Sequence, residues 1–280
     1  MADQRADRST WPDWRKAEYA EQAYMASFGQ PEAADAIARI GLTVSDVGGG
    51  VVWATRDDPS GGFLSRAVGQ GLGEPVTGAV LEEIVEVARA AGAPTIAVQP
   101  ATELVTPDLV ELMAQHGFGP GRTWDKLCRD VSAPPEAATD LRVEVLGAEH
   151  ARDFAGVMLV GFEMPEAARP FVEAETLLPG WMLFGALDGD EVVGVAGMYV
   201  DGDIAGLSGA ATLPEHRGRG AQRALMAARI TAAAEAGVTF LGTETWSEFD
   251  GAQNPSLHNM HWAGFRTLYQ RRNYVHVISQ

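Results

Sequence analysis

The fold of this 280-residue chain is best read from the segment TLPEHRGRGAQRAL, residues 212–225. It predicts the end of a strand, a glycine-rich loop and the opening of a helix near Gly220. Gly218 and Gly220 let the backbone approach a ligand without an intervening side chain. The first N–H groups of a helix lack intrahelical acceptors and lie at the positive end of its dipole. Positive charge is added by Arg217, Arg219 and Arg223. The segment therefore predicts a cradle for a pyrophosphate group.

Other uses of such a loop, and several classes of protein, are excluded by the sequence. The loop lacks the Lys-Ser/Thr pair of a nucleotide P-loop and the glycine spacing of a dinucleotide fingerprint. The balance of 21 basic against 38 acidic residues gives a net charge of −17, which disfavours a nucleic-acid partner. The single cysteine, Cys128, excludes an intrachain disulfide and a cysteine-based zinc site. A single cysteine fits a reducing, cytoplasmic setting, and we expect no metal. No apolar run suits a membrane span or a signal peptide.

The segments around the loop predict an α+β fold rather than a doubly wound sheet. Strands are expected at 141–146, 181–187, 191–200, 204–213, 238–244, 266–269 and 273–278. Helices are expected at 148–161, 166–176, 220–236 and 256–263. Tight turns at 188–190 and 201–203 join three of these strands into an antiparallel meander.

The chain also contains an internal repeat. The helix end, glycine and short strand of residues 88–98 resemble those of 232–242, and their glycines, Gly92 and Gly237, are 145 residues apart. A second match, 112–118 with 259–265, has nearly the same offset of 147 residues. The proline-rich segment 132–139 then predicts a linker between a first domain, 1–131, and a second, 140–280.

The loop resembles the coenzyme A loop of the GCN5-related N-acetyltransferase (GNAT) superfamily, Arg/Gln-x-x-Gly-x-Gly/Ala. Arg217 and Gly220 occupy its first and fourth positions, while Gln222 departs from the sixth. Residues 254–266, NPSLHNMHWAGFR, resemble the family's second motif, a helix that bears Asn or Ser and ends in Gly-Phe. The resemblance covers about 141–280 and implies two GNAT-like domains, each with a mixed, mainly antiparallel sheet flanked by helices.

The resemblance further implies acetyl-CoA as co-substrate and places the residues that bind it. The end of the fourth strand would pair with the pantetheine arm through Ala211, Thr212 and Leu213. The pyrophosphate would lie on the loop and helix start, at Arg217, Gly218, Arg219, Gly220, Ala221, Gln222 and Arg223. The second motif would line the opposite side with Asn254, Ser256 and Asn259.

Acetyl transfer to an amine requires a base, an oxyanion donor and an acid for the departing thiolate. A backbone N–H of the fourth strand would be the oxyanion donor. For the base we consider Glu244, which could equally be a solvated strand-end carboxylate, and then Ser208. The family's usual tyrosine acid is replaced by Met260. Nearby candidates are Tyr269, which could instead be a packing aromatic, and Asn259 and His258.

The acceptor wall is predicted to be acidic. The first two helices of the second domain and their loop, 157–178, contain four glutamates: Glu163, Glu166, Glu173 and Glu175. The opposite wall would include Glu244, Glu248 and Asp250, and Trp246 is a further candidate for binding the substrate. A cleft of one charge concentrates ligands of the other, which favours a small cationic amine. Alternatively, these carboxylates are ordinary solvated groups of an acidic protein.

In the first domain, the loop equivalent to the cradle is 69–75. It has glycines but no arginine, and it contains Glu74 and Pro75, so we expect this copy not to bind coenzyme A. The leading function is acetyl-CoA-dependent N-acetylation by a monomer or homodimer. The open alternatives are a catalytically silent coenzyme A-binding module, a protein amine as acceptor, or a longer acyl group.

Overall fold

The computed structural model describes residues 8–58, 60, 62–249 and 251–279. The helices are α1 (Asp13–Ser27), α2 (Ala34–Arg39), α3 (Gly78–Ala91), α4 (Pro107–Gln115), α5 (Ala151–Gly161), α6 (Arg169–Ala174), α7 (Ala221–Glu235) and α8 (Pro255–Trp262). The strands are β1 (Leu42–Val47), β2 (Gly50–Thr55), β3 (Arg66–Val68), β4 (Thr95–Gln99), β5 (Gly119–Asp130), β6 (Arg142–Leu146), β7 (Trp181–Asp188), β8 (Glu191–Asp201), β9 (Ile204–Thr212), β10 (Phe240–Trp246) and β11 (Arg266–Val277).

The internal repeat corresponds to two copies of one element order. In each copy a long helix (α3 or α7) is followed by a strand (β4 or β10), a second helix (α4 or α8) and a long strand (β5 or β11). The glycines that revealed the repeat follow the helices with left-handed backbone, at φ +76° for Gly92 and +78° for Gly237. The two halves of the chain thus repeat one order of helices and strands, which agrees with the repeat seen in the sequence.

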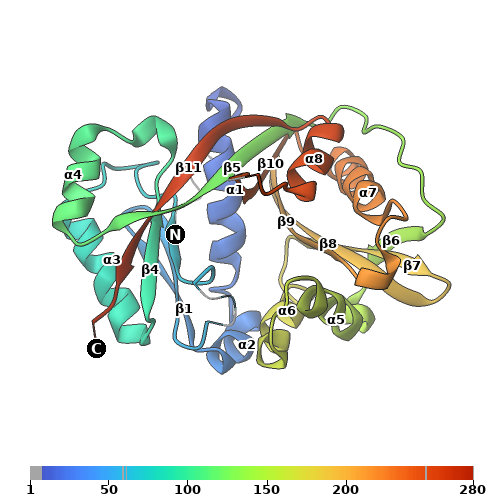
Figure 1. Cartoon of the computed structure of the whole chain (residues 1–280), viewed down its shortest axis with the longest axis horizontal. Helices are drawn as coiled ribbons and strands as arrows, with labels where there is room; N and C mark the ends of the chain where they lie inside the picture. The colour runs from blue at the N-terminus through green and yellow to red at the C-terminus, as the bar shows by residue number, and fades with distance from the viewer. Residues whose placement is uncertain (1–7, 59, 61, 250, 280) are drawn as a thin grey trace.

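All the strands of the described part of the chain form one sheet, ordered β1-β2-β3-β4-β11-β5-β10-β9-β8-β7-β6. The halves exchange their last strands, because β5 pairs with β10 of the second half and β11 pairs with β4 of the first. Both strands cross between the halves in Figure 1. The prediction of two separate strands at 266–269 and 273–278 is wrong, because β11 is one continuous strand. Its pairing with β5 has register shifts at 267/269 and 272/274.

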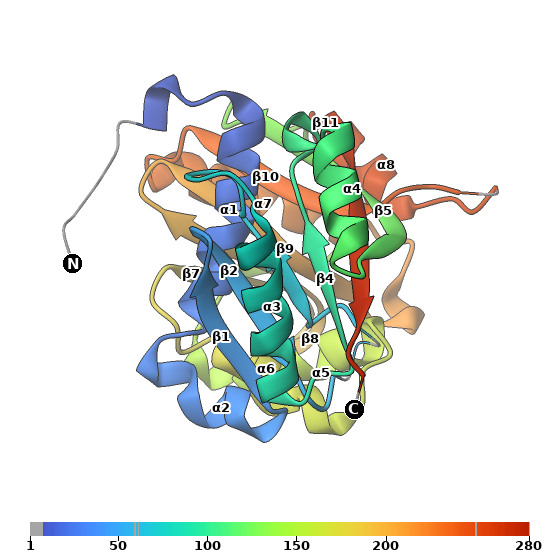
Figure 2. The same ribbon diagram turned by 90° about the vertical axis from the view of Figure 1, so that its left-hand side faces the viewer.

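The helices cover both faces of this sheet. Helices α1, α2, α5 and α6 pack on one face of the sheet, which is turned toward the junction of the two halves. In Figure 1, α1 runs between the two halves. Helices α3 and α7 cover the opposite face of the first and second half, and Figure 2 shows α3 and α4 from that side. The predicted helix 148–161 begins only at Ala151, after a 3₁₀ turn, and α6 is shorter than the predicted 166–176.

The halves share an apolar core at their junction. Phe28 from the first half stacks on Phe171 from the second, with ring centroids 4.8 Å apart. Trp53 contacts both rings edge-on, at 5.1 Å and 5.7 Å. Because such aromatic pairs are buried and complementary, the junction is a packed core, not a loose contact between domains.

Candidate functional site

The predicted cradle lies between β9 and α7. Its glycines adopt left-handed backbone, with φ of +79° at Gly218 and +83° at Gly220. No side chain caps α7, whose N-cap is Gly220. Within the described residues, the amide groups of 218–223 have no hydrogen-bond acceptor in the protein. An uncapped helix start with free amides is an arrangement that binds phosphate groups.

The three arginines of the loop differ in their contacts. Arg219 pairs with Asp140 at 2.6 Å and Asp188 at 2.5 Å, so its charge is already balanced. Arg217 is exposed, and its Nε donates to the Thr212 carbonyl at 3.3 Å. Arg223 donates to Asn259 on α8 at 3.1 Å. Arg217 and Arg223 are thus the arginines of the loop without a carboxylate partner among the described residues.

The strands that lead into the cradle separate. Strand β9 pairs in parallel with β10 only between 204–206 and 240–242, although both strands continue. Beyond Gly206 the edge of β9 that faces β10 therefore lacks a neighbouring strand, while its other edge still pairs with β8. At the end of this edge, the buried Thr212 hydroxyl has no hydrogen-bond partner. An extended ligand can add to such an open edge as a strand would.

The second motif starts with a capped helix. Buried Asn254 caps α8, because its Oδ1 accepts from the Ser256 amide at 3.0 Å and the Leu257 amide at 3.3 Å. Its Nδ2 donates to the Trp246 carbonyl at 2.6 Å. These contacts give Asn254 a structural role, whereas partly exposed Ser256 and Asn259 lie on the helix surface. Arg223 joins this motif to the cradle, because it donates to Asn259 and lies over the Trp262 ring, 4.8 Å from its centroid.

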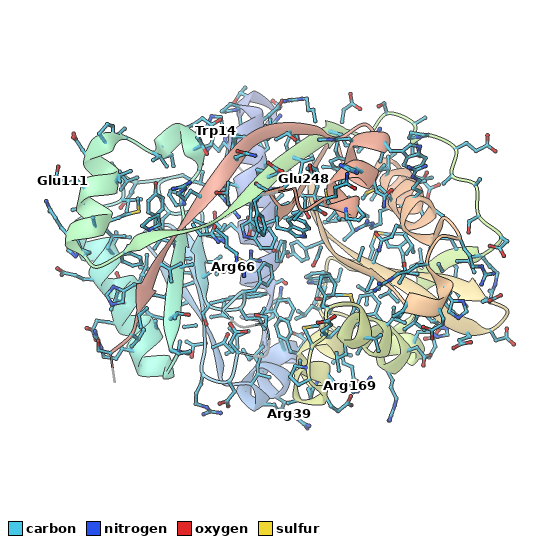
Figure 3. The ribbon with its side chains drawn as sticks, viewed as in Figure 1. Trp14, Arg39, Arg66, Glu111, Arg169 and Glu248 are labelled. Carbon is cyan, nitrogen blue, oxygen red and sulfur yellow. The ribbon has the colours of Figure 1, made fainter. Side chains whose placement is uncertain are left out.

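Glu244, the candidate base, lies in a buried cluster of six charged side chains. The cluster consists of Glu18 and Glu21 on α1, Arg66 on β3, Lys126 on β5, Glu244 on β10 and Arg271 on β11. Glu244 receives hydrogen bonds from Arg66 at 2.8 Å and from Arg271, and Lys126 lies 3.7 Å away. Arg66 lies between the two halves in Figure 3.

The cluster affects the chemistry of its carboxylates. Burial and the adjacent Glu21 raise the pKa of Glu244, while the three cations oppose that shift. A raised pKa suits a general base, but both oxygens of this carboxylate already accept hydrogen bonds from arginines. Tyr269, the candidate acid, donates to Glu18 at 2.5 Å at the edge of the cluster. Burial and that carboxylate raise the pKa of Tyr269 far above its usual value, which disfavours release of its proton.

Ser208 lies at an irregularity in the sheet. Strand β9 bulges beside it, because Ala196 pairs with Ala210 but Gly197 pairs with Ser208. Arg229 of α7, fully buried, donates through one nitrogen to the carbonyls of Gly197 at 3.1 Å and Ser208 at 3.2 Å. Burial lowers the pKa of Arg229 to about 10. Sequence reasoning missed this residue, although it lies beside Leu225, Met226 and Ile230 on the apolar face of the predicted helix.

The acidic residues proposed for the acceptor wall differ in their surroundings. Glu163 is exposed with φ +54°, and Glu166 is paired with Arg169. Glu248 is exposed, accepts from the Asn254 amide at 2.7 Å, and lies 3.0 Å from His258. Trp246 is partly buried and pairs across strands with Trp124. Asp250 lies outside the described residues.

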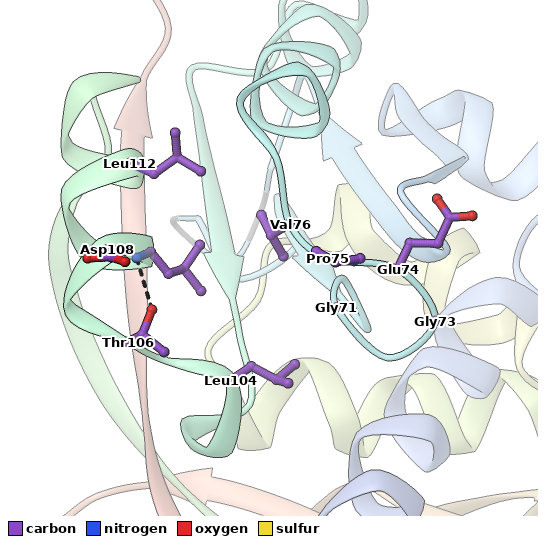
Figure 4. Close-up of a pocket in the computed structure, with 10 residues that line it drawn as sticks. Gly71, Gly73, Glu74, Pro75, Val76, Leu104, Thr106, Asp108 and Leu112 are labelled. Atoms are coloured by element: carbon purple, nitrogen blue, oxygen red, sulfur yellow. Dashed lines mark hydrogen bonds between the residues drawn. The ribbon is translucent and has the colours of Figure 1, made fainter.

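The loop of the first half that corresponds to the cradle, between β3 and α3, differs from it. It borders a cavity of about 500 Å³ lined by Gly71, Gly73, Glu74, Pro75, Val76, Leu104, Thr106, Asp108, Leu109 and Leu112 (Figure 4). Thr77 caps α3 by accepting from the Val80 amide at 3.3 Å, so this helix start already has a side-chain partner. Thr106 caps α4 in the same way, at 3.2 Å.

Among the described residues, no group of three or more His, Cys, Asp and Glu side chains is placed to hold a metal. In the same part of the chain, no helix is long and apolar enough to cross a bilayer.

Comparisons with known proteins agree with this geometry. Residues 152–254 match the model of the acetyltransferase (GNAT) family. Among solved structures, a GCN5-related N-acetyltransferase from Sphaerobacter thermophilus has a TM-score of 0.58 at 16% identity, covering 96% of this chain and 94% of the other. A tandem GNAT protein from the clavulanic acid biosynthesis pathway has the same score and identity, covering 96% and 97%. No curated protein sequence matched the chain.

These findings define a GNAT fold with two copies in tandem. The family match lies within the second half, at residues 152–254, and the solved structures show the same fold over both halves.

Proposed function

We propose that the chain is an acetyl-CoA-dependent N-acetyltransferase that acetylates a primary amine of a small molecule. The observation that supports this most strongly is the separation of β9 and β10, directly beside the uncapped start of α7. An open strand edge that leads to free amides suits a ligand with an extended amide arm and a pyrophosphate. Coenzyme A has both.

Each part of the site would contact a different part of the co-substrate. The edge of β9 at Ala211, Thr212 and Leu213 would pair with the pantetheine arm. The free amides of 218–223 would bind the pyrophosphate, assisted by Arg217 and Arg223. Arg229 would hold the bulge at Ser208 in place, because it fixes the carbonyls on both strands. Amides of this bulge would then donate to the developing oxyanion.

For the acceptor we propose a small cationic amine. Glu163 and Glu248 are exposed carboxylates on the α5–α6 loop and after β10. The net charge of −17 adds a long-range attraction for cations. An anionic amino-acid derivative would be repelled by the same field.

The test is release of thiol from acetyl-CoA, measured with putrescine, glucosamine and glutamate as acceptors. We expect turnover with the two cationic amines and little with glutamate. For the cationic amines, KM should rise several-fold between 20 and 300 mM NaCl, because screening shortens to about 8 Å at physiological ionic strength. A KM independent of salt, or a preference for glutamate, would contradict the cationic acceptor.

A second candidate is a coenzyme A-binding module without catalysis. Two observations favour it: Met260 replaces the usual tyrosine, and Tyr269 is engaged by Glu18. Tight acetyl-CoA binding with no thiol release for any amine would support this alternative over the enzyme.

A further inference from the structure

A second carboxylate, Glu175, lies next to the bulge of β8 and β9. It follows α6 directly, and only 6% of its surface is exposed. An ideal Cβ built on Gly197 would lie 3.5 Å from its Oε2, so the carboxylate fits against a backbone without a side chain. Among the described residues, no donor contacts either of its oxygens. Its oxygens are not among the fully buried polar atoms that lack a partner, so this mostly buried carboxylate keeps a small contact with solvent. Burial of a carboxylate without a donor still disfavours its charged form.

This carboxylate faces the same side of the sheet as the candidate reaction centre. Gly197 pairs directly with Ser208, and residues opposite one another in an antiparallel pair have Cβ positions about 5 Å apart. An ideal Cβ on the bulged Gly209 would meet Met158 and Phe162, and α5 lies on the same face as α6. Glu175 therefore lies beside the part of β9 where the proposed acetyl group would be held.

The surroundings of Glu175 are apolar or neutral. Gly197 and Tyr199 come from β8 and Trp181 from β7, and Trp181 donates to Ser27 of α1 at 3.0 Å. The titratable groups around this cluster are Tyr199 and Tyr24, and burial raises the pKa of both hydroxyls. Among the charged residues near these groups, Arg66 donates to the Tyr24 hydroxyl, and Arg229 donates to the Gly197 carbonyl from α7, on the other face of the sheet. Glu173, on α6 itself, is partly exposed.

We propose that Glu175, rather than Glu244, is the general base for the acceptor amine. This proposal rests on the proposed acetyltransferase function. The two carboxylates differ in one decisive respect: Glu244 accepts hydrogen bonds from two arginines, whereas the oxygens of Glu175 are free to accept a proton.

Glu175 takes one proton from the acceptor ammonium, and the neutral amine nitrogen attacks the acetyl carbonyl carbon. The C–S bond then breaks, and the thiolate takes a second proton from the nitrogen. The products are the N-acetyl amine and free thiol, and Glu175 returns its proton to solvent.

The pH dependence of the rate follows from burial. Desolvation raises the pKa of Glu175 to about 8, so this group would be protonated at neutral pH and would act as a base above it. The rate of the wild type should therefore rise between pH 7 and 9.

The experiment compares Glu175→Gln with Glu83→Gln, a control that makes the same substitution at an exposed glutamate of α3 in the first half. Thiol release from acetyl-CoA is measured from pH 6 to 9.5 with putrescine. We expect Glu175→Gln to lower kcat about 100-fold at pH 8 and to remove the inflection near pH 8, with KM for acetyl-CoA within twofold of the wild type. Glu83→Gln should retain the inflection. A wild-type pH profile in Glu175→Gln would overturn the proposal.

A second measurement separates this proposal from the proposed function. In the wild type, the unfolded chain loses the Glu175 proton near pH 4.5 and the folded protein near pH 8, so stability falls with pH in that interval. Glu175→Gln should show a smaller fall in Tm between pH 5 and 8. If no amine gives turnover but this difference is found, the acetyltransferase function fails while the buried acid is verified. If the two Tm profiles are parallel, the assignment of Glu175 fails.

Discussion

Substitution of Gly218 by Glu is expected to reduce the affinity for acetyl-CoA at least about 100-fold, or about 2.7 kcal/mol. A carboxylate would then lie among the free amides of 218–223 and repel the pyrophosphate. Gly218 is preferred over Gly220 for this test, because a side chain at Gly220 would clash with the Ala138 carbonyl of the linker. No atom lies within 4 Å of a Cβ built at Gly218, so the substitution adds charge without a clash.

The chain offers a matched control in Gly237→Glu. Gly237 lies just beyond the other end of α7, with φ +78° against +79° for Gly218 and equally open space around it. Both variants therefore carry the same backbone strain and the same added charge. Calorimetric titration should give Gly237→Glu an affinity within about twofold of the wild type. Equal affinities of the two variants for acetyl-CoA would contradict the assignment of the pyrophosphate to the amides of 218–223.

The second large effect is expected at Arg271. Replacing it by Met leaves Glu18, Glu21 and Glu244 with only Arg66 and Lys126 in a buried site. Removing one partner from a buried ion-pair network usually costs about 3–5 kcal/mol, because the remaining charge is neither solvated nor paired. Urea unfolding at pH 7 should therefore show a loss of that size in the free energy of unfolding.

Arg272→Met is the control, since it makes the same change on the next residue of β11, whose side chain is exposed. We expect it to alter the free energy of unfolding by less than about 0.5 kcal/mol. If Arg271→Met were no more destabilising than Arg272→Met, the cluster would not hold α1 against the crossing strands.

Much of this architecture could be predicted from the sequence because its signals are local. Gly92 and Gly237 mark helix ends through their positive φ, and their common offset revealed the repeat. The glycine loop and the start of α7 were likewise predictable, since Gly218, Gly220 and the first turn of the helix are contiguous. Such features depend on backbone conformation within a few residues.

The features that sequence reasoning missed depend on contacts between distant segments. The exchange of β5 and β11 leaves no local trace, because a strand has the same pattern whichever half it joins. The charged cluster draws on five elements, so Glu244 resembled an ordinary strand-end carboxylate. In the sequence, Glu175 looked like the other acidic residues of its segment. Its burial depends on Gly197 and Trp181, which lie on other elements. Arg219, expected at the pyrophosphate, pairs with Asp140 and Asp188 across turns that the sequence alone does not bring together.

We propose one acetyl-CoA site per chain, in the second half. Thr77 caps α3 in the first half, whereas no side chain caps α7 in the second. Calorimetric titration of the full chain with acetyl-CoA tests this claim most directly. We expect one acetyl-CoA molecule to bind per chain. Absence of binding, or two equivalent sites, would contradict this assignment.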